Sequence, residues 1–410
     1  KNADEKLVPV TDVEDVKLRL KVRPSRSGNR IVSVFLVNEQ EEPRDLKERA
    51  WVFQPEISVS DPAKKAVFRR RRPVDDSQDG EQKMLEMLYR RHVEFAVGHG
   101  VSVDWEIDPE DAQKAVSVRS CFLPEYEVPA TDATSPDDYA ELAGVELGMR
   151  ELAELPEDQL FQKLEILPGA YEQWIQNQQL RISTGDLAGF DAEAKANLQK
   201  CESTAKRIRA GIDAIRTDAN ALEAFRFANH AMALQRTRGI FARKRRQGED
   251  VKFEDIDAVV MNRSWRPFQL GFLLLSLPSL VDPQHLERSG SPSENLADLI
   301  WFPTGGGKTE AYLGLTAFTL AIRRLQGDLG GFDNTAGVTV LMRYTLRLLT
   351  LQQFQRATAL MCAMEYLRRQ EMDRDAHRWG EQPFRIGLWV GKKVTPNNTN
   401  DAHTEIQTRR

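Results

Sequence analysis

The first third of the chain carries short alternating and apolar segments that predict β-strands. Val16–Val22 alternates apolar and basic side chains, as a half-exposed strand does, whereas Ile31–Val37 is almost continuously apolar. A helix is predicted at Lys83–Val97, where apolar residues recur at helical spacing. The further strands predicted here are Trp51–Val59, Val101–Trp105 and Ala115–Val118. The pattern therefore predicts a β-rich mixed accessory domain over residues 1–135.

Between residues 136 and 261 the apolar spacing becomes that of helices. Alanine, leucine, glutamate, glutamine and arginine dominate this region, and they are strong helix formers. Two long helices are predicted at Asp191–Arg216 and Leu222–Arg238, with turns at Pro168–Gly169 and Thr184–Asp186 between shorter ones. We expect a helical domain over residues 136–261.

From residue 262 onward, strand-like and helix-like segments alternate. The predicted strands are Leu299–Phe302, Gly337–Met342 and Arg385–Val390, and the predicted helices are Glu310–Arg323 and Thr345–Arg374. Such alternation is typical of parallel βαβ units. The predicted fold class is therefore multidomain α+β and α/β, with residues 262–410 forming the first, incomplete part of a nucleotide-binding α/β lobe.

Composition is that of a soluble globular protein, with 41% hydrophobic and 29% charged residues among 410. The net charge of −5 gives no sign of nucleic-acid binding by the whole surface, so any such site must be local. Three widely spaced cysteines argue against a disulfide framework and favour a reducing compartment. The longest apolar stretch, Leu270–Val281, is too short to span a bilayer, and no apolar signal region opens the chain. We expect a cytoplasmic location and no membrane partner.

The most informative motif is a glycine loop between a predicted strand and a predicted helix. It reads Thr304-Gly305-Gly306-Gly307-Lys308-Thr309-Glu310. Glycines let successive backbone N–H groups converge on phosphate oxygens, and the following helix N-terminus also favours an anion. Lys308 is predicted to reach the β- and γ-phosphates of ATP and Thr309 to ligate Mg²⁺, so these two are the predicted catalytic residues. All seven residues are candidate nucleotide contacts. Phe302 stands where the strict phosphate-loop pattern has glycine, and the variant here is similar to that of superfamily 2 helicases.

A second motif, Trp265-Arg266-Pro267-Phe268-Gln269, precedes the loop. Phe268 is a candidate for stacking on a base, and the amide of Gln269 suits the N6/N7 edge of adenine because it donates and accepts at once. Helicases of the same superfamily have a similar arginine-proline-aromatic-glutamine element upstream of their phosphate loop. A core segment that opens a helix would have the same sequence, and that alternative stays open.

Two later segments are candidate nucleic-acid contacts. Arg343, Tyr344, Thr345 and Arg347 follow the second predicted strand, where the superfamily places a backbone-contacting element, and Gly391 with Lys392 follows the third. The alternative is that these side chains only solvate ordinary turns. Two basic clusters, at residues 64–72 and 236–246, either contact phosphates or form solvated flanks beside acidic neighbours.

Three stretches together resemble one family: Arg90–Trp105, Phe302–Tyr312 and Arg343–Gln353. Through them the chain resembles the helicase subunit of the bacterial DISARM anti-phage system, the DrmA family of superfamily 2. The resemblance implies a RecA-like lobe and an ATP-driven motor that acts on DNA, either single-stranded or duplex with an overhang. It also implies a complex with a helicase-associated defence protein, and DNA methyltransferases as partners.

One departure limits what this segment can do alone. Superfamily 2 chemistry needs a downstream Asp-Glu pair and arginines from a second RecA-like lobe, and neither is found in these residues. We therefore expect the segment alone to bind nucleotide poorly and hydrolyse it hardly at all, because phosphoryl transfer depends on positioned charges. Robust DNA-stimulated hydrolysis by the segment would contradict this. Two other functions remain open: a motor that translocates duplex DNA in a restriction complex without separating strands, and a nucleotide-binding scaffold for a partner protein.

Overall fold

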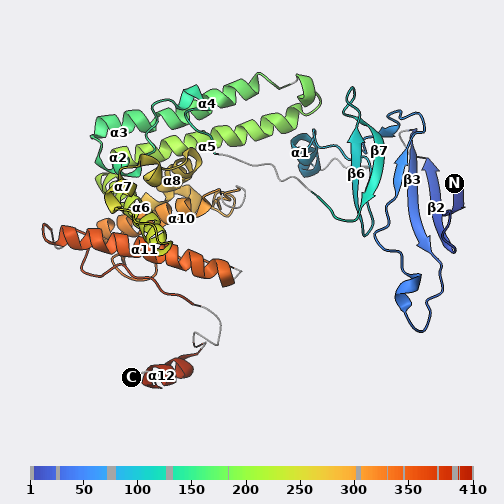
Figure 1. Ribbon diagram of the computed structural model, residues 1–410. Helices are drawn as coiled ribbons and strands as arrows, with labels where there is room; N and C mark the ends of the chain where they lie inside the picture. Colours follow the sequence, from blue (N-terminus) through green and yellow to red (C-terminus); the bar gives the residue numbers. More distant parts are fainter. Residues whose placement is uncertain are drawn as a thin grey trace. The chain divides into compact units, whose positions relative to one another are not determined.

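The computed structural model describes residues 4–24, 28–71, 80–125, 133–182, 184–301, 306–329, 331–344, 347–375, 378–389, 396 and 398–408 (Figure 1). The chain divides into two compact units, Lys1–Pro129 and Ala130–Arg410. The domain boundaries predicted at residues 135 and 261 stay predictions.

The first unit opens with an antiparallel sheet of β1 (Asp4–Pro9), β2 (Val16–Pro24) and β3 (Arg30–Asn38). Leu18 lies opposite Val8 and Leu36, so these apolar side chains share one face. The basic residues of β2 lie on the other face, where Glu5 pairs with Arg19 and Lys21. The strands predicted at residues 16–22 and 31–37 are confirmed.

The second sheet is built on β7 (Lys114–Cys121). This strand pairs antiparallel with β4 (Ser58–Ser60), β5 (Phe68–Arg69) and β6 (Ser102–Ile107). The strands predicted at 101–105 and 115–118 are confirmed. The strand predicted at 51–59 is wrong before Ser58, because Gln54 has a φ of 47° and Pro55 has no N–H to donate. A 3₁₀ turn, η1, covers Lys47–Ala50.

Helix α1 (Gly80–Leu88) is shorter than the helix predicted at 83–97. The prediction is wrong after Leu88, since the backbone N–H of Arg71 donates to the carbonyl of Glu94 at 2.7 Å. A hydrogen bond from a residue distant in sequence thus replaces the helical bond that the apolar spacing suggested.

The second unit is helical. Its longer helices are α3 (Glu157–Leu164), α4 (Ile166–Gln179), α5 (Asp191–Thr217), α6 (Ala219–Arg246), α8 (Pro267–Val281), α10 (Lys308–Gln326), α11 (Arg347–Met372) and α12 (Thr399–Thr408). Its shorter elements are α2 (Met149–Glu154), α7 (Phe253–Asp257), α9 (Leu286–Ser289), η2 (Ala140–Leu142), η3 (Gly185–Leu187), η4 (Val260–Arg263) and the small antiparallel pair β8 (Asp328–Leu329) and β9 (Phe332–Asp333). The helices predicted at residues 191–216, 222–238, 310–323 and 345–374 are confirmed as α5, α6, α10 and α11, although α6 continues beyond its predicted end to Arg246.

Helix α6 lies at the centre of this unit and packs against α2, α5, α10 and α11 (Figure 1). Ala221, Ala224, Phe225, Ala231 and Met232 are all fully buried on it. Small and apolar residues occur on several sides of the helix, which is typical of a helix enclosed by others rather than one that faces water. The helix that begins at the glycine loop, α10, therefore rests directly on the main core.

The parallel sheet expected in residues 262–410 is not formed by the residues that the structure describes. Residues 299–301, 337–342 and 385–389 adopt no strand, so those strand predictions are wrong for them. Their apolar side chains are left exposed: Leu299 by 87%, Leu341 by 83% and Trp389 by 79%. A strand exists only where a neighbouring strand accepts and donates its backbone hydrogen bonds, and the local pattern does not supply that neighbour. The observed class is mixed α+β, mainly helical with small antiparallel sheets.

No helix in the described parts of the chain combines the length and the apolar run that crossing a bilayer requires.

The end of α11 is held to the following segment by Glu365. Its carboxylate accepts hydrogen bonds from Arg368 and Arg369, each at 2.8 Å, and from the backbone N–H of Phe384 at 3.1 Å. The Arg368 guanidinium is the main cause that lowers the pKa of Glu365 from its usual 4.5 to about 2.

Glu365→Gln is expected to destabilise the protein at pH 7 by about 1.5–3 kcal/mol, because it removes a charge-assisted network. A carboxyl group whose pKa is lowered by folding stabilises the folded state above its unfolded pKa. The contribution is therefore lost as pH falls from about 4.5 towards about 2. Urea unfolding at several pH values should show the gap between variant and wild type closing over that window. Glu371→Gln, on the same helix beside the exposed Arg374, is the control. A gap that does not change with pH would contradict the assignment.

Candidate functional site

The described part of the glycine loop begins at Gly306 and leads straight into α10. Gly307 is the residue before the helix and has a φ of 93°, in the left-handed region that glycine tolerates without strain. Lys308 and Thr309 form the first turn of α10 and are half-buried, and Gly306 is buried. The predicted contacts Thr304 and Gly305 lie outside the described residues.

The carbonyl groups of the loop are held by the upstream motif. The Arg266 guanidinium donates to the Gly306 carbonyl at 2.8 Å, and the Gln269 Nε2 donates to the Gly307 carbonyl at 2.7 Å. In a planar trans peptide the N–H points opposite to the C=O. The N–H groups of Gly307 and Lys308 are therefore directed away from Arg266 and Gln269. This is the orientation that a phosphate-binding loop needs, with donors on one face and carbonyls tied on the other.

Gln269 is only 3% exposed, and both ends of its amide have partners in the protein. Its Oε1 accepts from the backbone N–H of Arg266 at 2.8 Å, which caps the start of α8. Its Nε2 is the donor to Gly307 described above. The sequence suggested a base contact for this side chain, whereas the structure places it against the loop. Its role in binding adenine, with that of the half-buried Phe268, stays a prediction.

Trp265 connects the Arg266–Gln269 motif to the hydrophobic core. It is buried, and its indole N–H donates to Asn229 Oδ1 on α6 at 2.8 Å. Its ring also lies against Gly314 on α10, where an added Cβ would come within 2.5 Å of the ring. Asn229 in turn donates to the Phe225 carbonyl, so its amide is satisfied within the core. Trp265 therefore sets the position of Arg266 and Gln269 relative to α10.

Three arginines from separate elements gather at the loop. Arg236 on α6 and Arg356 on α11 both pair with Oε1 of Glu310, Arg236 at 3.4 Å, while Arg266 bonds to Gly306. The Glu310 side chain is 13% exposed, and that of Arg236 is 25% exposed. Burial lowers the pKa of Arg236, and the neighbouring Arg356 and Arg266 lower it further. In the sequence Arg236 belongs to a general basic cluster and Arg356 is an ordinary residue of a predicted helix, because only folding brings α6 and α11 to the loop.

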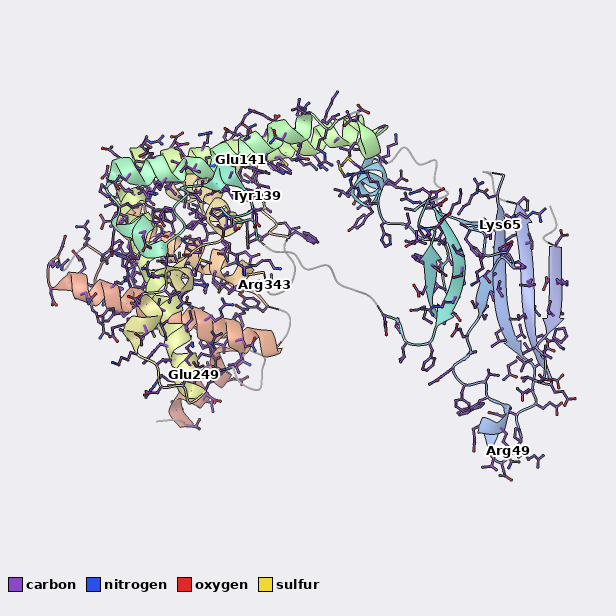
Figure 2. The ribbon with its side chains drawn as sticks, turned by 45° about the horizontal axis from the view of Figure 1, so that its top comes forward. Arg49, Lys65, Tyr139, Glu141, Glu249 and Arg343 are labelled. Atoms are coloured by element: carbon purple, nitrogen blue, oxygen red, sulfur yellow. The ribbon has the colours of Figure 1, made fainter. Side chains whose placement is uncertain are left out.

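The candidate nucleic-acid contacts are placed only in part. Arg343 and Tyr344 precede α11 and are exposed, and Figure 2 shows Arg343 beside that helix in the second unit. Tyr344 is 40% exposed, and the partial burial of its side chain raises its pKa. Arg347 is the first residue of α11, but the structure does not describe its side chain. Thr345, Gly391 and Lys392 lie outside the described residues.

Two residues of the basic cluster at the end of α6 pair with the acidic residues that follow it. Lys244 contacts Glu249 at 2.8 Å and Arg245 contacts Asp250 at 2.9 Å; Glu249 is labelled in Figure 2. Arg238 stacks on the Phe253 ring at 3.8 Å. These contacts favour a solvated flank at this end of the helix.

No family model matches the chain. The chain is 35% identical over 377 residues to a protein of Bacillus paralicheniformis (strain ATCC 9945a) that is described as DISARM protein DrmA. The match covers 90% of this chain and 31% of the relative. The chain thus spans about a third of the length of the curated relative that it matches.

Proposed function

Since the chain belongs to the DrmA family, we propose that it is part of an ATP-dependent superfamily 2 DNA helicase or translocase that acts in DISARM defence against phages. The observation that carries the proposal is the loop at α10. Its carbonyls are tied by Arg266 and Gln269, its N–H groups face the other way, and Lys308 follows at the helix N-terminus.

The residues present fit Mg²⁺·ATP. The backbone N–H groups of Gly307 and Lys308 would hold phosphate oxygens, Lys308 would neutralise the β- and γ-phosphates, and the Thr309 hydroxyl would ligate the metal. Bound Mg²⁺ supplies charge neutralisation between the phosphates. The protein's share is to present these donors in a fixed arrangement, which the contacts of Trp265, Arg266 and Gln269 provide.

We propose that residues 262–410 contribute to a RecA-like lobe in the full-length protein. Support comes from the three segments that surround α10 and α11 in the sequence. They carry apolar residues typical of buried parallel strands, yet Leu299, Leu341 and Trp389 are exposed. Pairing of these segments with each other and with further strands would bury them and complete the sheet.

The proposed substrate is DNA, single-stranded or duplex with an overhang, bound in part through Arg343, Tyr344 and Arg347. The proposed partners are a helicase-associated defence protein and DNA methyltransferases, in the cytoplasm. These assignments go beyond family membership, because the match covers only 31% of the relative's length.

The test is whether DNA raises ATP turnover by the full-length protein. We expect a several-fold stimulation by DNA with an overhang. We also expect Arg343→Ala to require more DNA for half-maximal stimulation, whereas Arg369→Ala, an exposed arginine near the other end of α11, does not. Turnover that DNA leaves unchanged would favour the scaffold function and refute the motor. Strand-displacement and triplex-displacement assays then separate a helicase from a duplex translocase.

A further inference from the structure

We propose that Arg236 and Arg356 form an anion site for the terminal phosphate of a nucleoside triphosphate, and that Glu310 competes with that phosphate for both arginines. The inference rests on the proposed function, since it concerns the same nucleotide. Both arginines lie on helices that are remote from the loop in sequence.

Arg236 and Arg356 both reach the loop through Glu310. The Glu310 carboxylate lies over Gly307, since its Oε2 is 3.6 Å from the position of a Cβ built on that glycine. The other oxygen of the same carboxylate carries Arg236 and Arg356. Both guanidinium groups therefore contact a carboxylate that itself lies against the loop.

The balance of charge favours an anionic ligand. Arg236 and Arg356 bring two positive charges to the single carboxylate of Glu310 in the first turn of α10. Among the residues that the structure describes, the ion pairs of Arg236 and Arg356 both go to Glu310. The pKa of the partly buried Arg236 is lowered in spite of Glu310, so its charged form is incompletely compensated. An anion with more charge than one carboxylate would relieve this.

Glu310 has the chemistry of a stand-in for phosphate. A carboxylate and a phosphate both accept hydrogen bonds from guanidinium groups, and both are favoured at a helix N-terminus. Arg236 is also held at its Nε by the Asn262 carbonyl at 2.9 Å, so its position does not depend on Glu310 alone. The terminal phosphate of a triphosphate can therefore replace Glu310 without releasing this arginine.

The experiment measures binding of a fluorescent non-hydrolysable ATP analogue and of the matching ADP analogue, both with Mg²⁺, to the full-length protein. Arg236→Gln and Arg356→Gln are expected to weaken the ATP analogue on the order of 10-fold or more, and the ADP analogue much less, because each loses a charge-assisted contact to the terminal phosphate. Glu310→Gln is expected to strengthen binding of the ATP analogue, because it removes the competing carboxylate. Arg369→Gln, on α11 and paired with Glu365, is the control and should change neither.

The outcomes separate this inference from the proposed function. If wild type binds neither analogue, or Lys308→Ala binds both as well as wild type does, the proposed function fails and the anion site with it. If Lys308→Ala abolishes binding but the arginine variants affect both analogues equally, only the anion site is refuted. Weaker binding by Glu310→Gln also refutes it, since a purely structural ion pair predicts that sign. Thermal unfolding of each variant shows whether a loss reflects misfolding, and in that case the sign of the Glu310→Gln effect decides.

Discussion

Replacing Lys308 with alanine is expected to abolish ATP turnover by the full-length protein. Lys308 opens α10 next to Gly307, and the loop N–H groups alone cannot neutralise the charge on the β- and γ-phosphates. Removing one preorganised charge of this kind typically lowers turnover on the order of 10²-fold or more. A steady-state phosphate-release assay with saturating DNA measures the effect.

The matched control for this variant is Lys244→Ala, which removes a lysine that pairs with Glu249 at the end of α6. It should leave turnover unchanged. The Lys308 variant should also unfold at the same temperature as wild type, since the buried positions of α10, such as Leu313 and Phe318, are untouched. Unchanged turnover in Lys308→Ala would refute the assignment of the loop as the catalytic nucleotide site.

Gly211→Ala is expected to destabilise the protein by about 3 kcal/mol or more, the upper range for overpacking a core. Gly211 lies on α5 where the helix crosses α8, and an added Cβ would come within 1.9 Å of the Leu274 carbonyl oxygen. The obstacle is backbone, so no side-chain rotation relieves it and the two helices must separate. Denaturant unfolding of the wild type and the variant measures the difference.

Gly239→Ala provides a control of opposite sign. Gly239 lies within α6, and a Cβ there would meet nothing within 4 Å. Alanine at an open helical position should stabilise the protein by about 0.5–1 kcal/mol, because glycine loses more backbone freedom on folding.

Since α8 begins at the Arg266–Gln269 motif, Gly211→Ala should also weaken nucleotide binding. Equal effects of the two substitutions would show that α5 and α8 do not cross as closely as described.

Local sequence pattern was sufficient for the long helices and for most strands of the first unit. The helices α5 and α6 follow from helix-forming residues, and β2 follows from strict alternation around Leu18 and Leu20. These features depend on interactions within a few residues of each other. The same reasoning extended α1 too far and predicted a strand before Ser58, because a hydrogen bond from Arg71 and the conformation of Gln54 lie outside that local pattern.

The sheet in residues 262–410 marks a different limit. The apolar residues at 299–302, 337–342 and 385–390 are strand-like in composition, but a parallel strand is made by its neighbours. No local signal states whether those neighbours are present. The described residues of these segments form no strand, and apolar side chains such as Leu299, Leu341 and Trp389 are exposed.

By itself the sequence determined that a glycine loop stands before a helix, with Arg266 and Gln269 upstream, and it predicted phosphate binding there, since that chemistry needs adjacent residues of fixed type. Only the tertiary structure decided that Gln269 faces the Gly307 carbonyl, that Trp265 joins the motif to α6 and α10, and that Arg236 and Arg356 meet at Glu310. The physical reason is distance along the chain. A motif encodes what neighbours in sequence can do, whereas packing of α6, α8, α10 and α11 determines which distant charges share one site.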